Sequence, residues 1–118
     1  YLAVAGGGAL GAVSRLAVAR IFTWSAFPVG TLVINVTGSF ILGWFLTFIQ
    51  PRLNFSDYVR LAVATGFVGA YTTFSTFMFE TDSMSQEKSF VRAALYLGGS
   101  VVLGLAAVRA GAVLAQKL

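Results

Sequence analysis

Hydroxyl and aromatic side chains gather in one stretch of a segment that is apolar enough to cross a membrane. Residues 72–79 read Thr-Thr-Phe-Ser-Thr-Phe-Met-Phe, with four hydroxyls and three phenyl rings. Hydroxyl groups donate hydrogen bonds and the edge of a phenyl ring is positive, so this set can stabilise an anion without a fixed charge. Polar groups inside an apolar span are costly unless they face another helix or water. The stretch is therefore the first candidate for a functional site.

A helix break is predicted just before these side chains. Gly66 and Gly69 weaken a helix, and Thr72 and Thr73 follow at once. A helix broken at mid-membrane is tolerated only where its backbone is buried in protein or lines a cavity. Such a break exposes carbonyl groups that can hold a cation and N–H groups that favour an anion.

Two phenylalanines of the stretch are predicted to share one helix face. Phe74 and Phe77 lie three residues apart, and the hydroxyls of Ser75 and Thr76 lie beside them as donors. A packed aromatic core, with the hydroxyls bonded back to their own helix, explains the same residues. Both interpretations stay open, but the combination of glycines, paired hydroxyls and spaced rings is unusual and favours an anion site.

Two polar residues in the preceding segments are further candidates. Thr31, Asn35 and Gly38 recur at helical spacing and share one face. The Asn35 amide either bonds a neighbouring helix, which its spacing alone favours, or donates to an anion. Arg15 lies about two turns before the end of the first apolar segment. It either reaches the membrane interface or attracts anions in an aqueous vestibule.

The composition indicates an integral membrane protein. Of 118 residues, 58% are hydrophobic and 10% charged, whereas soluble domains carry about a quarter charged residues. A membrane span needs about 20 mostly apolar residues. Such segments run from Leu2 to about Phe22, Val29 to Ile49, Leu61 to Phe79 and Phe90 to Leu114, joined by connections at 23–28, 50–58 and 80–89. We expect a single all-α domain of four transmembrane helices over residues 1–118.

The residue types that are absent exclude several classes of protein. Without histidine or cysteine the chain lacks the usual general base and thiolate, so an enzyme is not expected. The acidic residues are predicted in or beside loops: Asp57, Glu80, Asp82 and Glu87. A small proton-coupled four-helix exporter needs a carboxylate inside the membrane, so this alternative is disfavoured. A scaffold without transport is a third possibility, and the scattered basic residues argue against nucleic acid.

The basic residues give almost no orientation bias. With four spans, one side holds Arg52, Arg60 and Lys117, with Arg109 leaning toward it, and the other holds Arg20, Lys88 and Arg92. Orientation normally follows an excess of Lys and Arg on the cytoplasmic side. Either residues before Tyr1 carry the deciding charge, or the protein inserts both ways and pairs antiparallel. Gly7 and Gly11 have the GxxxG spacing of closely packed helices, which supports a dimer only weakly.

These residues together resemble the Fluc (CrcB-type) family of fluoride channels over essentially the whole chain. The matching segments are Gly11–Arg15, Gly30–Gly38 with Asn35, Thr65–Phe77 with Glu80 just after, and Tyr96 with Ser100 one turn later. The motif in the third segment is the most specific of these. The family can carry another hydroxyl four residues after this serine, and here that place is Gly104.

The resemblance implies an antiparallel, dual-topology homodimer in the bacterial inner membrane that passively exports cytoplasmic fluoride through two pores. It implies a ring pair at Phe74 and Phe77 and a vestibule arginine at Arg15. The pore-lining polar residues it implies are Thr31, Asn35, Ser75, Thr76, Tyr96 and Ser100. It also implies a structural Na⁺ at the dimer centre, held by backbone carbonyls of Gly69 and Thr72 from each subunit.

Dual topology can be tested by fusing reporters of cytoplasmic and external location to the C-terminus. Because the basic residues are balanced, we expect both reporters to be active at comparable levels. Adding one Lys or Arg beside a span end should then shift the ratio of the two activities. Activity of a single reporter in the unmodified chain would contradict dual insertion.

Overall fold

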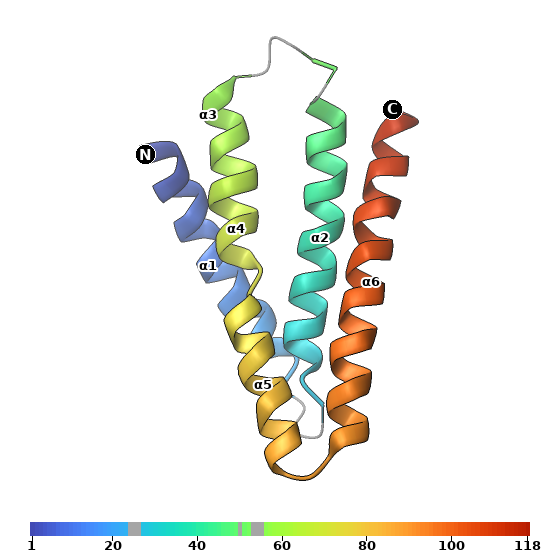
Figure 1. The fold of residues 1–118 in the computed structure, drawn as a ribbon. Helices are drawn as coiled ribbons and strands as arrows, with labels where there is room; N and C mark the ends of the chain where they lie inside the picture. Colours follow the sequence, from blue (N-terminus) through green and yellow to red (C-terminus); the bar gives the residue numbers. More distant parts are fainter. Residues whose placement is uncertain (24–26, 50, 53–55) are drawn as a thin grey trace.

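The computed structural model describes residues 1–23, 27–49, 51–52 and 56–118, and the regular structure of this part is entirely helical. The molecule is elongated, 52 × 30 × 20 Å (Figure 1). Four apolar helical stretches are long enough to cross a membrane: Leu2–Ile21, Val29–Ile49, Asp57–Gln86 and Phe90–Gln116. They confirm the four expected spans. Parts of the expected connections, residues 24–26, 50 and 53–55, lie outside the described residues, and the expected connection at 50–58 ends earlier because Asp57 and Tyr58 are helical.

The first helix, α1 (Leu2–Ile21), packs against η1 (Leu61–Val68), a π-helical segment of the third span. A Cβ atom added at Gly7 would collide with the backbone of Ala62, and one at Gly11 with the backbone of Phe67. The two glycines therefore let the helix axes approach within one subunit. The GxxxG spacing is thus used for packing inside the chain.

The third span is composite. It consists of α3 (Asp57–Arg60), η1, α4 (Gly69–Tyr71) and α5 (Phe74–Gln86). Between α4 and α5, Thr72 and Thr73 have extended backbones, with ψ angles of 157° and 118°. The Thr73 hydroxyl accepts from the Thr76 N–H at 3.2 Å and so caps the first turn of α5. Figure 1 shows the chain leaving α4 and re-entering a helix at this point.

The structure corrects the expected connection at 80–89, because α5 continues to Gln86 and places Glu80 and Asp82 on a helix. The hydroxyls of Thr81 and Ser83 donate to carbonyls one turn earlier, at 2.8 and 2.9 Å, so they pair within the helix instead of ending it. The helix ends where Lys88 adopts a left-handed φ of 62° and the Ser89 N–H donates to the Met84 carbonyl.

The helices α2 (Val29–Ile49) and α6 (Phe90–Gln116) run in the same direction and pack along much of their length (Figure 1). A Cβ atom at Gly43 would collide with the Val108 backbone, and one at Gly111 with the carbonyl of Phe40. These glycines fix how close the two helices lie. The seam therefore depends on backbone approach rather than on interlocking of large side chains.

Large apolar side chains cover the outer face of α6. Leu95, Val102 and Leu105 are each about two-thirds exposed, whereas Tyr96 on the inner face is 1% exposed. A soluble surface rarely carries a continuous apolar patch of this kind. The outer face suits lipid tails or another apolar protein surface.

Gly43→Ala is expected to lower the free energy of unfolding in detergent by roughly 1–3 kcal/mol, because the new methyl group must push α6 away. Gly98→Ala is the matched control, since a Cβ atom there meets nothing within 4 Å. Its stability should be unchanged or slightly raised. Equal losses of stability in the two variants, measured by denaturant titration, would contradict the close approach at Gly43.

Candidate functional site

Asn35 on α2 clamps the backbone between α4 and α5. Its Nδ2 donates to the Thr73 carbonyl at 3.0 Å, and its Oδ1 accepts from the Thr73 N–H at 2.8 Å. One side chain thus satisfies both backbone groups of a residue that has left the helix, groups that would each cost roughly 1–3 kcal/mol if buried without partners. The Asn35 amide does bond a neighbouring helix, and its second Nδ2 hydrogen is not needed for this clamp.

In the same geometry, two backbone carbonyls lose the N–H partners that they would have in a continuous helix. In a continuous helix the Thr73 N–H would donate to the Gly69 carbonyl and the Thr76 N–H to the Thr72 carbonyl. Here the first donates to Asn35 and the second to the Thr73 hydroxyl. The carbonyls of Gly69 and Thr72 therefore keep lone pairs for another partner. Such carbonyls at the C-terminal end of a helix segment suit a hard cation such as Na⁺.

A hollow of about 270 Å³ lies between α2 and this break. Its wall includes Asn35, Gly38, Ser39, Thr72, Thr73, Phe74 and Phe77. The structure therefore brings together Asn35 and the two predicted rings, although they are far apart in the sequence. An amide, hydroxyl groups and two phenyl rings line the hollow, and none of its described lining residues is charged.

A second hollow of about 200 Å³ lies on the α1 side of the break. Its wall brings together Arg15, Thr31 and Thr76, three more of the predicted residues. Thr73 lines both hollows and so stands between them. Its position at the junction was not predicted, because only the fold shows which residue of the Thr72–Thr73 pair faces both sides.

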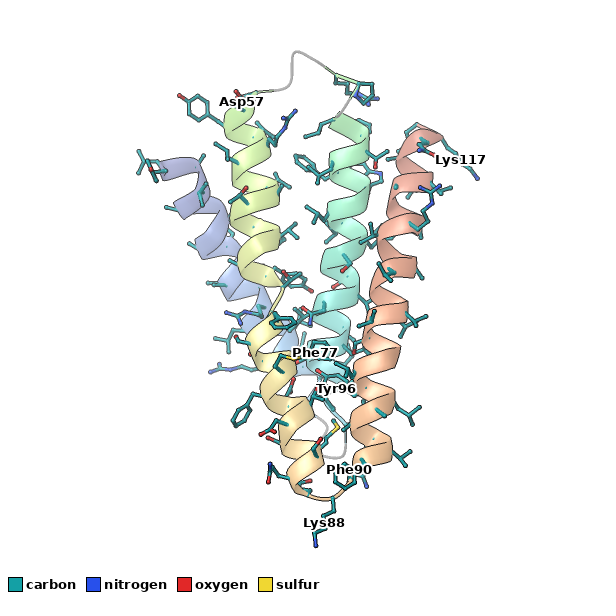
Figure 2. All side chains as sticks on the ribbon, in the orientation of Figure 1. Asp57, Phe77, Lys88, Phe90, Tyr96 and Lys117 are labelled. Carbon is teal, nitrogen blue, oxygen red and sulfur yellow. The ribbon has the colours of Figure 1, made fainter. Side chains whose placement is uncertain are left out.

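The two predicted rings have different surroundings. Phe77 is 8% exposed and packs edge-to-face on Tyr96, with ring centroids 4.9 Å apart (Figure 2). Phe74 is 74% exposed. One ring is therefore held by the core of the subunit, and the other presents its surface outside it.

The Tyr96 hydroxyl donates to Glu80 at 3.0 Å. This pairing joins α5 and α6 beside the Phe77 ring. The link between Glu80 and Tyr96 was not predicted, because the acid was expected in a connection. The signal was available in the spacing of Phe77 and Glu80, which puts the ring and the acid on one face of a continuous helix.

Two predicted hydroxyls lie elsewhere. Ser75 is exposed on α5 and lines neither hollow. Ser100 lies on α6, and within the described part of the chain its buried Oγ has no hydrogen-bond partner. A buried hydroxyl without a partner is unusual in a native structure and calls for an explanation.

The four spans define a polytopic membrane protein, and an uncharged hollow lies beside the interruption of its third span. A family model described as CrcB-like protein, Camphor Resistance (CrcB), matches residues 2–112. The chain belongs to this CrcB family. The family is one of ion channels rather than enzymes, and the chain is a multi-pass protein of a bacterial membrane.

Several curated relatives carry the name fluoride-specific ion channel FluC. That of Acidobacterium capsulatum is 46% identical over 100% of this chain and 97% of its own length. That of Solibacter usitatus is 42% identical over 99% of this chain and 98% of its own length. The relative from Methylococcus capsulatus is 49% identical over 98% of this chain, which spans 52% of that longer protein.

Asn35→Ala is expected to lower stability by roughly 2 kcal/mol or more, because both backbone groups of Thr73 lose their partner. The loss should be local, with faster hydrogen exchange in peptides that cover residues 72–76 in detergent. Thr47→Ala, further along α2, is the control and should leave this exchange unchanged. An unaltered exchange rate at residues 72–76 in Asn35→Ala would contradict the clamp.

Proposed function

We propose that the chain is a fluoride-selective channel that lets fluoride leave the cytoplasm by passive electrodiffusion. The observation that carries the proposal is the hollow beside the helix interruption, where Asn35, Phe74 and Phe77 meet without a fixed charge. The name of the relatives, fluoride-specific ion channel, supports the choice of ion. Arg15 in the second hollow would attract the anion toward the entrance.

The donor set suits a small and strongly hydrated anion. Such an ion loses its water only if several donors replace it at once. The second Nδ2 hydrogen of Asn35, the hydroxyl of Thr76 and the positive edges of the rings are donors of this kind. Conduction also requires release, so neutral groups serve better than a lysine or arginine inside the narrow part.

We further propose that two subunits pair antiparallel and enclose two pores. The 74% exposure of Phe74 supports this, because a pore ring needs cover that one subunit does not provide. The balanced basic residues support insertion in both orientations. The redirected donors at Thr73 and Thr76 support a Na⁺ at the centre, held by the carbonyls of Gly69 and Thr72 from each subunit.

One observation favours a second candidate, a proton-coupled exporter. Glu80 lies on α5 within the third span, where a carboxylate could carry a proton. Its bond from Tyr96 instead ties it into the packing beside Phe77, which favours the channel. The two candidates differ in what drives flux: a channel needs only the ion gradient, and an exporter needs the proton gradient.

Liposomes that contain the purified protein should release fluoride once a potassium ionophore removes the opposing voltage, and they should retain chloride. Phe74→Ile and Phe77→Ile should abolish this release while the size-exclusion profile stays the same. Phe79→Ile is the matched control, because Phe79 is 73% exposed and lies outside both hollows.

Wild-type vesicles that keep their fluoride under these conditions would refute the channel. Uptake of an organic cation that depends on a proton gradient would support the exporter instead.

A further inference from the structure

The register between α2 and α6 brings Ser39 beside a glycine. The two parallel helices pair Gly43 with Val108, and one turn earlier they pair Ser39 with Gly104. A Cβ atom built on Gly104 would lie 3.8 Å from the Ser39 Oγ. The Ser39 hydroxyl therefore lies next to the place that a side chain of residue 104 would occupy.

The same register continues toward the site. One further turn back it places Ser100 at the level of Asn35, and the turn before that places Tyr96 at the level of Thr31. The inner face of α6 thus carries a phenol at Tyr96 and a buried, unpartnered hydroxyl at Ser100. At the next turn, Gly104, α6 has no side chain to contribute.

Ser39 differs from other hydroxyl residues of the membrane spans. The hydroxyls of Thr37, Thr72 and Thr81 donate to carbonyls of their own helices at 2.6–3.2 Å. Within the described part of the chain, no such bond is made by the Ser39 hydroxyl, which lines the larger hollow with Asn35 and Phe77. Its donor is therefore available to a ligand in that hollow.

We propose that Ser39 is an anion-contacting residue, which supplies from α2 the hydroxyl that α6 lacks at Gly104. This inference rests on the proposed channel function. The anion would pass the level of Asn35 and meet the Ser39 hydroxyl one turn further along the hollow that both residues line. Ser39 would therefore contribute to the rate of passage, whereas Gly43 and Gly111 only set the helix spacing.

The test compares fluoride release from liposomes by the wild type and variants at positions 39 and 104. Ser39→Ala should slow release about tenfold, the effect of losing one hydrogen bond to an anion. Adding Gly104→Ser to Ser39→Ala should restore most of the rate, because the new side chain starts 3.8 Å from the Ser39 Oγ position and returns a hydroxyl. Adding Gly104→Ala instead is the matched control and should not restore the rate.

The outcomes separate the two proposals. If the wild type releases fluoride and Ser39→Ala releases it at the same rate, the role of Ser39 is overturned and the proposed channel function stands. Equal rescue by Gly104→Ser and Gly104→Ala would also overturn it, because packing would then explain the effect. If the wild type releases no fluoride, both the proposed channel function and the role of Ser39 are refuted. If Ser39→Ala changes the size-exclusion profile, Ser39→Cys replaces it, since a thiol fills the site but donates weakly.

Discussion

The backbone of Thr73 must find hydrogen-bond partners inside an apolar span, and much of the structure follows from this requirement. Two extended residues in an apolar span leave N–H and C=O groups that lipid cannot satisfy. Asn35 supplies both partners from α2, and the Thr73 hydroxyl supplies one more for the first turn of α5. The interruption therefore persists only while α2 lies at the correct height and distance.

The helix α2 consequently determines the relative positions of the interrupted third span and α6. On one face Asn35 holds the break, and on another Gly43 admits the backbone of α6. Thr37 adds a hydroxyl contact of 2.9 Å to Tyr71, the last residue of α4. Because these contacts lie on one rigid helix, they fix the spacing between the break and the Tyr96–Glu80 pair on the neighbouring helices.

The four spans could be predicted from the sequence, because hydropathy is a local signal. The glycines that were expected to break the third span are helical, since Gly66 lies in η1 and Gly69 begins α4, and the extended residues are Thr72 and Thr73. The different surroundings of Phe74 and Phe77 could not be predicted, because helical spacing gives a face but not what covers it. Likewise, Glu80 was predicted in a connection, whereas α5 continues to Gln86. The hydroxyls of Thr81 and Ser83 bond carbonyls of this same helix.

On the proposed function, a single interruption would serve ions of both signs by offering carbonyls to a cation and donors to an anion. Redirecting two N–H groups leaves the carbonyls of Gly69 and Thr72 on the α4 side, where the helix end is negative. The amide of Asn35 and the ring of Phe77 lie in the hollow that adjoins α5, whose first turn is positive. On the proposed function, a cation would stiffen the break while an anion passes beside it. Neither role needs an ionised side chain in the hollow, which would hold the anion too tightly for conduction.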